Sequence, residues 1–298
     1  MTIAWVFPGQ GSQKLGMAES LLTLEGAKER FQYASDLLER DLLAICQSGE
    51  KSKTLISDLN DTRNTQPALF VVESLIIDAM RLQGRRPSLL AGHSLGEFSA
   101  LYAGEVINAE SALKLLKIRS ELMAASDGGA MTAVLGFERL ELEELVKNTD
   151  GVVIANDNST SQVVLSGRPE SVNQVVDSLR CKRAVPLKVS GAFHSPFMKD
   201  AARKFSLELD KVSFSNATIP ILSNSDPTPS IDSNMLKIKL KDQMINGVRW
   251  RETMDLFVEN GISTFVEIGP GNVLSGLAKR CMKGVTISGI SNSEDLGY

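Results

Sequence analysis

A five-residue turn with the pattern Gly-x-Ser-x-Gly, at residues 92–96, constrains this chain more than any other feature. The short apolar run 89–91 comes before it and predicts a buried strand, and an apolar helical pattern that includes Phe98 follows it. A strand, this turn and a helix together form the context of a nucleophile elbow, in which small glycines let the backbone bend sharply. We therefore predict that Ser94 projects as a nucleophile at a helix N-terminus, where backbone N–H groups favour a developing oxyanion. The alternative, a glycine-rich turn with an incidental serine, is disfavoured by the flanking pattern.

An activated serine needs a base, and the chain contains only two histidines. His93 directly precedes Ser94, and adjacent residues on a sharp turn usually project in different directions. His194 lies just before a helical pattern that begins at Pro196, and a helix N-terminus favours the neutral imidazole that a base must have. We therefore predict His194 as the general base, although a lone histidine is more often structural. No acidic residue lies near it in the sequence, so a backbone carbonyl could orient the ring.

An arginine lies on the apolar stripe of a predicted helix over residues 109–125. The stripe has the i, i+3, i+4 spacing of one helix face and contains Ala112, Leu115, Leu116, Leu122 and Met123. Arg119 falls on the same stripe, and Ser120 lies on the opposite side of the helix. A buried arginine needs an anion. The pattern alone does not decide between a substrate anion and a structural ion pair or a guanidinium that extends to solvent.

Composition excludes several classes of protein. The net charge of −4 and the pI of about 5.4 give no electrostatic reason to expect nucleic acid as a partner. No apolar run reaches the length of a membrane span, and the N-terminus lacks the basic region of a signal peptide. The cysteines, Cys46, Cys181 and Cys281, are odd in number and far apart. They predict a reducing, cytoplasmic compartment with no disulfide framework and no thiolate metal site.

The order and length of the predicted helices and strands change after residue 127. Strand, helix, strand, strand, helix and strand follow in the βαββαβ order of a ferredoxin-like motif, with the last strand expected at 184–189. Elsewhere strands alternate with longer helices, which predicts a mostly parallel sheet covered on both faces. We therefore predict an α/β core over 1–127 and 194–298 and a ferredoxin-like subdomain over 128–193. Within the core we expect one helix over 27–46 and another that begins at Thr65-Gln66-Pro67 and continues over 68–82.

Taken together, the motifs resemble the malonyl-CoA:acyl carrier protein transacylase family over nearly the whole chain. The segments that carry this resemblance are FPGQGSQ at 7–13, TQPALF at 65–70, GHSLGE at 92–97, KIRSELM around Arg119, GAFHS at 191–195 and EIGPG at 267–271. The resemblance implies an α/β hydrolase-like core with a ferredoxin-like insert. It also implies a ping-pong transfer of malonyl groups from malonyl-CoA to acyl carrier protein in fatty acid synthesis, with no metal and no cofactor.

The resemblance also implies roles for individual residues. Ser94 would be the nucleophile and His194 the base, with the backbone N–H groups of Gln10 and Leu95 as the oxyanion hole. Arg119 would pair with the malonyl carboxylate. The supporting residues would be Gln243, whose region supplies the carbonyl that holds the histidine, Phe193, which accompanies malonyl rather than branched acyl groups, and Gln66.

Two positions depart from the family pattern. Thr160-Ser161 stands where the family usually has Pro-Gly, and Ser120 replaces the glycine after the arginine. An acidic carrier protein would meet basic residues near the groove, for which Lys182, Arg183 and Lys188 are candidates, although a solvated face explains these charges slightly better. Two other functions stay open. A serine hydrolase shares the elbow but gives Arg119 no role, and a non-catalytic docking module would not need Ser94 and His194.

Overall fold

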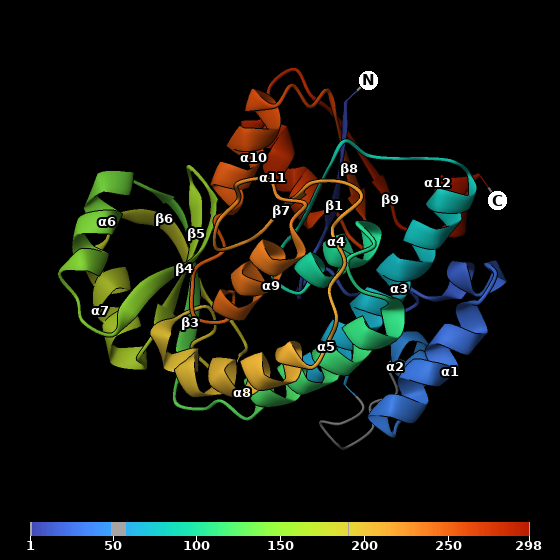
Figure 1. Cartoon of the computed structure of the whole chain (residues 1–298). Coiled ribbons are helices and arrows are strands. Elements are labelled where there is room, and N and C mark those ends of the chain that lie inside the picture. Colours follow the sequence, from blue (N-terminus) through green and yellow to red (C-terminus); the bar gives the residue numbers. More distant parts are fainter. Residues whose placement is uncertain (1, 49–57, 190, 298) are drawn as a thin grey trace.

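The computed structural model describes residues 2–48, 58–189 and 191–297, which form two sheets of different kinds (Figure 1). A five-stranded sheet, in which every pairing is parallel, has the order β7-β2-β1-β8-β9. Its strands are β1 (Ile3–Phe7), β2 (Leu89–Gly92), β7 (Ile221–Leu222), β8 (Thr264–Ile268) and β9 (Thr286–Ile290). The register pairs Phe7 with Gly92, so the loop after β1 lies beside the turn after β2.

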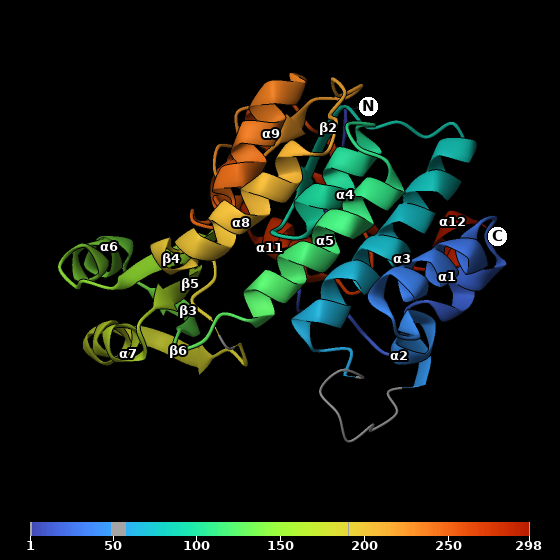
Figure 2. The same ribbon diagram turned by 60° about the horizontal axis from the view of Figure 1, so that its bottom comes forward.

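Helices cover both faces of this sheet, and successive residues of a strand therefore enter different cores. Trp5 and Phe7 pack on one face with the long helices α3 and α5, whereas Ala4 and Val6 pack on the other with α10 and α11. Figure 2 shows α1, α3 and α5 side by side over the first face. The helices of the core are α1 (Ala27–Leu38), α2 (Leu42–Ser48), α3 (Thr62–Leu82), α4 (Gly96–Ala103), α5 (Ala109–Ala124), α8 (Lys199–Asp210), α9 (Ser233–Asp242), α10 (Trp250–Glu259), α11 (Val273–Cys281) and α12 (Ser293–Leu296).

The second sheet is antiparallel and belongs to the βαββαβ segment, which stands to one side of the core (Figure 2). Its elements are β3 (Ala130–Phe137), α6 (Arg139–Lys147), β4 (Val152–Ser159), β5 (Gln162–Gly167), α7 (Pro169–Ser178) and β6 (Cys181–Pro186). The strand order β4-β5-β3-β6 is that of a ferredoxin-like motif, and a separate apolar cluster packs α6 and α7 onto one face. The predicted fold class is confirmed; the boundaries at 127/128 and 193/194 stay a prediction.

The edge strand β4 joins this insert to the core. Backbone hydrogen bonds run from the Asp157 N–H to the Val248 carbonyl (2.9 Å) and from the Val248 N–H to the Ala155 carbonyl (2.8 Å). The Asp157 carboxylate also accepts hydrogen bonds from Arg139 of the insert and Arg251 of α10. One carboxylate therefore holds both parts of the chain together beside the end of β2.

Several predicted elements differ from the observed ones. The helix expected over 27–46 is two helices, because Glu39 takes a left-handed conformation (φ 57°) that ends α1. Helix α3 begins at Thr62 with Asp61 as its N-cap, three residues before the predicted start. Pro67 therefore lies inside the helix, and the Arg63 carbonyl that its missing N–H leaves free accepts a hydrogen bond from the Arg40 guanidinium (2.9 Å).

Three further differences concern strands. The last strand of the insert is Cys181–Pro186 rather than 184–189, because its register on β3 pairs Phe137 with Cys181 and Thr132 with Pro186. The turn expected at 156–161 is mostly strand, since β4 continues to Ser159. Strand β9 was not predicted at all.

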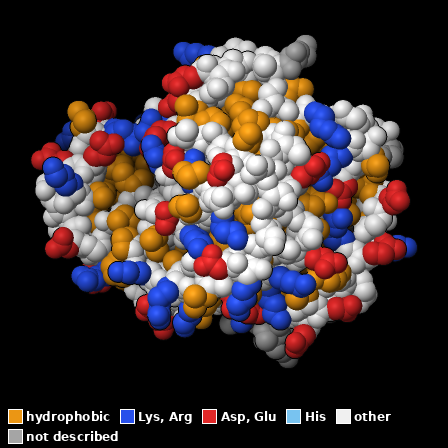
Figure 3. Space-filling model, in the orientation of Figure 1, with side chains coloured by type: hydrophobic (Ala, Val, Ile, Leu, Met, Phe, Trp, Pro, Cys, Tyr) orange, Lys and Arg blue, Asp and Glu red, His pale blue; other side chains and the backbone are white. Residues whose placement is uncertain are grey.

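Figure 3 shows acidic and basic side chains interspersed over one face of the molecule. Among the described residues, none of the helices combines the length and the apolar composition needed to span a bilayer.

Gly96 gives a direct test of the close packing at the end of β2. A Cβ atom there would lie 2.1 Å from the Phe7 carbonyl oxygen, which is backbone and cannot move aside. We expect Gly96→Ala to lower the free energy of unfolding by about 3 kcal/mol, the upper part of the range for overpacking. Gly276 in α11 is the control, because a Cβ there meets nothing within 4 Å. Gly276→Ala should stabilise by about 0.5–1 kcal/mol in the same urea titration. Equal stability of the two variants would contradict this account.

Candidate active site

The turn between β2 and α4 is a strained elbow that carries Ser94. Ser94 has a φ of 53°, a left-handed conformation that non-glycine residues rarely adopt. The chain can bend this sharply only without side chains at its ends, since a Cβ on Gly92 would lie 1.9 Å from the Gly96 backbone. The serine is therefore presented at the carboxyl end of β2 and directly before α4, as the sequence pattern predicts.

His194 lies against this serine although it comes 100 residues later in the chain. Ser94 Oγ and His194 Nε2 are 2.8 Å apart, and His194 Nδ1 lies 2.9 Å from the Gln243 backbone oxygen. A carbonyl oxygen can only accept, so Nδ1 carries the proton and Nε2 is left to accept from the serine hydroxyl. A main-chain carbonyl thus occupies the place of the missing acid.

Burial keeps this imidazole neutral. His194 is 4% exposed, and desolvation, assisted by the nearby Arg119 charge, lowers its pKa to about 3. The hydrogen bond from Nδ1 to Gln243 acts in the opposite direction and is weaker. The ring is therefore in the form that can take a proton throughout the neutral pH range.

Arg119 is the third group at this point, and it is a buried cation without a carboxylate partner. Its guanidinium donates to Gln66 Oε1 (2.6 Å), Gln243 Oε1 (2.9 Å) and Ser94 Oγ (3.1 Å), and the side chain is 1% exposed. Within residues 2–48, 58–189 and 191–297 no carboxylate forms a salt bridge with it, and its Nε has no acceptor. Burial lowers its pKa to about 10, so the group stays charged at neutral pH. The site therefore presents a desolvated positive charge beside the serine.

Two glutamines and a glutamate hold the arginine in place. The Gln243 amide accepts from Arg119 and donates to Glu97 Oε2 (2.8 Å), so the carboxylate fixes which way the amide points. Gln66 Nε2 donates to the Thr62 hydroxyl (2.8 Å), which turns Gln66 Oε1 toward the guanidinium. Burial raises the pKa of the Glu97 carboxyl, while its hydrogen bonds and Arg119 act to lower it. Ser120, expected on the side of the helix opposite the apolar stripe, is nevertheless fully buried and donates to the Lys117 carbonyl.

These groups open into a cavity of about 530 Å³ between the core and the insert. Gln10, Leu95 and Phe193 line it together with Ser94, Arg119 and His194. Among the described residues, the backbone N–H groups of Gln10 and Leu95 meet no hydrogen-bond acceptor. The β1–β2 register brings the Gln10 loop to the elbow, so the two residues with unpaired N–H groups both line the cavity beside the serine.

The other histidine, His93, forms part of the wall of the cavity. Its Nε2 lies 2.9 Å from Asn158 Oδ1, and its ring packs edge-on against Trp250 at 5.5 Å. The sequence did not single out Asn158, Glu97 or Asn224 as site residues. Glu97 lies in the GHSLGE segment, which was the only available signal, whereas the two asparagines become recognisable only through tertiary contacts.

Known proteins resemble this chain over nearly its whole length. Residues 4–295 match the family model described as an acyl transferase domain. The chain belongs to this family. Its relatives include the malonyl CoA-acyl carrier protein transacylase of Synechocystis sp., which is 45% identical over 296 residues that cover 99% of each chain. The enzyme of the same name from Staphylococcus aureus strain MRSA252 is 36% identical and covers 98% of this chain and 96% of its own.

Solved structures of family members have the same fold. The crystal structure of the Synechocystis malonyl-CoA:ACP transacylase superimposes with a TM-score of 0.95 and covers 100% of this chain and 99% of its own. A type II PKS acyl-carrier protein in complex with its malonyl-transacylase superimposes with a TM-score of 0.92 at 36% identity, over 99% of this chain and 98% of that one. As a member of this family, the chain is an acyltransferase.

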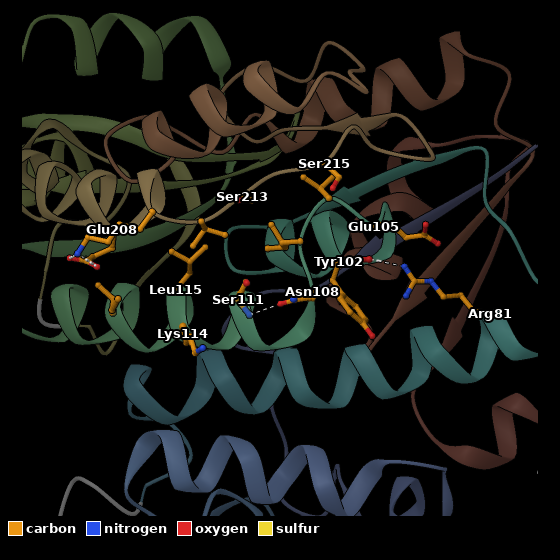
Figure 4. A pocket seen from close by; sticks show the side chains of 15 residues that line it. Arg81, Tyr102, Glu105, Asn108, Ser111, Lys114, Leu115, Glu208, Ser213 and Ser215 are labelled. Atoms are coloured by element: carbon orange, nitrogen blue, oxygen red, sulfur yellow. Dashed lines mark hydrogen bonds and ion pairs between the residues drawn. The ribbon is translucent and has the colours of Figure 1, made fainter.

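A larger cavity, of about 890 Å³, lies away from the acyltransferase site (Figure 4). It is bordered by α5 and the segment after α8, and its polar side chains Arg81 and Asn108 make hydrogen bonds within the protein. Arg81 donates to the Tyr102 and Ala103 carbonyls, and the Asn108 side chain caps α5. Neither Ser94, His194 nor Arg119 reaches it. The smaller cavity is therefore the one associated with the chemistry.

The remaining sequence candidates are dispersed. Of the three basic residues considered for a carrier protein, Lys188 lines the active-site cavity, whereas Lys182 and Arg183 lie exposed on β6. The described part of the chain contains no group of three or more His, Cys, Asp or Glu side chains placed to hold a metal ion.

The burial of both imidazoles can be measured directly, because the chain has only two histidines. We expect an NMR titration of the ring protons to show His194 neutral from pH 8 down to at least about pH 5, with His93 also below the usual value of about 6.5. Since the folded state resists protonation, stability should fall as pH falls from about 6.5 toward 3. Chain unfolded in urea, where both rings should titrate near 6.5, is the control. A folded-state His194 pKa near 6.5 would contradict this description.

Proposed function

We propose that this acyltransferase moves a malonyl group from malonyl-CoA to the phosphopantetheine thiol of an acyl carrier protein, in fatty acid biosynthesis, through a malonyl ester of Ser94. The observation that carries the proposal is Arg119, a buried guanidinium with no carboxylate partner among the described residues, 3.1 Å from the serine oxygen. An acyl group with a free terminal carboxylate supplies the missing anion. The names of the relatives support the same substrate and acceptor.

In the first half-reaction, the Ser94 hydroxyl gives its proton to His194 Nε2 while its oxygen attacks the thioester carbonyl of malonyl-CoA. The oxyanion that forms is held by the N–H groups of Gln10 and Leu95. When the intermediate collapses, the carbon–sulfur bond breaks and the CoA sulfur takes the proton from His194. The products are free CoA and malonyl-Ser94.

The second half-reaction runs through the same groups in reverse. The carrier protein's thiol gives its proton to His194 and attacks the ester carbonyl, and the same two N–H groups hold the oxyanion. The carbon–oxygen bond breaks, and Ser94 recovers its proton from the imidazole. Because the neutral base is restored at the end of each half-reaction, the same imidazole serves both directions.

The acyl group would be selected by two residues that line the cavity, Arg119 and Phe193. Arg119 would fix the carboxylate by a two-point contact, with Gln66 and Gln243 keeping the guanidinium in its plane. Phe193 is 6% exposed and lines the cavity next to His194, where its ring leaves little room for a branch on the acyl chain. This arrangement favours malonyl over longer or branched groups.

The proposal also covers the carrier protein, the need for cofactors and the location in the cell. An acidic carrier would approach the mouth of the cavity, where Lys188 is the basic residue of the three candidates that reaches it. No metal or cofactor takes part in the steps above, since the serine, the imidazole and two backbone N–H groups account for each bond and proton. A cytoplasmic location is supported by Cys46, Cys181 and Cys281, which are all free thiols, as in a reducing compartment.

The role of Ser94 can be tested by intact mass spectrometry after brief exposure to malonyl-CoA. The native chain should gain one malonyl group and lose it when carrier protein is added, because the ester is an intermediate of the transfer. Ser94→Ala should fold normally and gain none. Ser99→Ala, on the following helix, is the control and should still form the adduct. An adduct of normal yield on Ser94→Ala would refute the proposed nucleophile.

The role of Arg119 can be tested by comparing malonyl-CoA with acetyl-CoA. In Arg119→Ala the malonyl carboxylate would be buried and unpaired, which costs about 2–5 kcal/mol, or roughly 30- to several-thousand-fold in kcat/KM. Acetyl-CoA has no such carboxylate, so its kcat/KM should stay unchanged or rise. Arg119→Lys should restore only part of the activity, because an ammonium cannot make the planar two-point contact.

The measured quantity is the ratio of kcat/KM for malonyl-CoA over acetyl-CoA. Arg30→Ala is a suitable control, because it also removes a cation of the core, one that pairs with Asp78 rather than with the serine. Its ratio should equal that of the native chain. A folded Arg119→Ala with an unchanged ratio would make Arg119 structural and would favour a general serine hydrolase.

A further inference from the structure

We propose that Asn224 is a positioning residue for the nucleophile, holding the strained elbow so that Ser94 and the Leu95 N–H point into the cavity. This inference rests on the proposed role of Ser94. Asn224 is distant in sequence from every motif that carries the family resemblance, and it does not line the cavity. Its effect on the reaction would therefore pass entirely through the backbone of the elbow.

The short strand β7 places this residue beside the elbow. Its pairing with β2 sets Ile221 beside Leu90 and Leu222 beside Ala91. Continuing this parallel register by two residues brings Asn224 level with the start of the turn. A strand of two residues at the edge of the sheet thus delivers one buried amide, 3% exposed, to the nucleophile.

Both polar atoms of the Asn224 side-chain amide form hydrogen bonds with the backbone of the elbow. Asn224 Oδ1 accepts from the Ser94 N–H (2.6 Å), and Asn224 Nδ2 donates to the Gly92 carbonyl (2.6 Å). An N–H group can only donate and a carbonyl can only accept, so the orientation of the amide is fixed. The side chain closes the turn across its open side, where the left-handed Ser94 leaves its N–H without a partner in the sheet.

The backbone of Asn224 is fixed as well. Its N–H donates to Glu97 Oε2 (3.1 Å), and its carbonyl accepts from the Arg249 N–H (3.0 Å). Glu97 is also the acceptor for Gln243, whose amide holds Arg119 and whose carbonyl holds His194. The nucleophile, the base and the cation are therefore joined by one buried hydrogen-bond network, in which Asn224 is the link to the Ser94 backbone.

A hydrogen bond at this point has consequences for the chemistry that a packing contact would not have. Rotation of the peptide before Ser94 would turn Oγ away from His194 Nε2 and would turn the next N–H, that of Leu95, away from the oxyanion. Both changes slow attack on any acyl group. They leave the interaction between Arg119 and the malonyl carboxylate unaltered, so selectivity should not change.

The test uses Asn224→Ala and the nearly isosteric Asn224→Asp. For Asn224→Ala we expect acylation by malonyl-CoA to slow by about 10- to 100-fold at a similar KM, the usual effect of removing a group that orients a reacting one. Labelling by a fluorophosphonate should slow by a similar factor, and the malonyl-to-acetyl ratio should stay that of the native chain. The fluorophosphonate carries no malonyl group, so this arm reports on the elbow even if the proposed acyl substrate is wrong.

Asn224→Asp provides a pH signature. A protonated carboxyl can donate its O–H to the Gly92 carbonyl while its other oxygen accepts from the Ser94 N–H, as the amide does. An ionised carboxylate can only accept, so one of its oxygens would face the Gly92 carbonyl oxygen without a donor. We therefore expect the labelling rate relative to the native chain to be highest near pH 5 and to fall by about tenfold by pH 8.

Two variants serve as controls. Ile221→Val removes one buried methylene from the same strand and should lower the Tm without changing the labelling rate. Asn260→Asp introduces the same charge on the surface and should show no change in pH dependence. The proposal is overturned if Asn224→Ala destabilises the fold but labels within twofold of the native rate. It is also overturned if the relative rate of Asn224→Asp is independent of pH. If Asn224→Ala does not fold, the pH series on Asn224→Asp decides the question alone.

Discussion

The buried charge of Arg119 is the constraint on which the rest of this site depends. A guanidinium that is 1% exposed and has no salt bridge within the described residues is costly to bury, and three neutral acceptors recover only part of that cost. A structural arginine would be expected to pair with a carboxylate of the protein. Here the nearest carboxyl in the network, Glu97, is separated from it by the Gln243 amide. Under the proposed function, the acyl group that reaches Ser94 supplies the carboxylate that neutralises this charge.

The same burial determines the state of the base. Removing His194 from water and placing it near a cation both favour the neutral ring, which lowers its pKa to about 3. An aspartate on Nδ1, as in many serine enzymes, would raise the pKa and would add a negative charge beside the site for the substrate carboxylate. A carbonyl orients the ring without either effect. The absence of an acid from this hydrogen bond is thus compatible with a substrate that carries its own negative charge.

The sequence was enough to predict those features that depend only on residues close together in the chain. The glycines around Ser94 predict an elbow because only small residues fit the turn. The βαββαβ order of elements predicts the insert because each element has its own periodicity.

Prediction from the sequence failed where the deciding contact comes from a residue far away in the chain. Ser120 was placed opposite the apolar stripe from helix periodicity alone, and it is fully buried there although Lys114 and Glu121 on the same side are exposed. Pro67 was expected to start a helix, and only the Arg40 side chain, 23 residues before Arg63, explains how the helix tolerates it. Asn224, 130 residues from Ser94, had no local signal at all.

Contacts between residues far apart in the sequence also explain why the insert and the core both line one cavity. Edge strand β4 hydrogen-bonds to the segment at Val248 and carries Asn158 to His93, while Asp157 binds Arg139 of the insert and Arg251 of the core. The segment at Val248 follows Gln243 by only a few residues, and Gln243 holds both Arg119 and His194. A shift of the insert would therefore move the wall of the cavity and the support of the base together. The position of the ferredoxin-like motif is thus set by the same short segment that orients the catalytic groups proposed here.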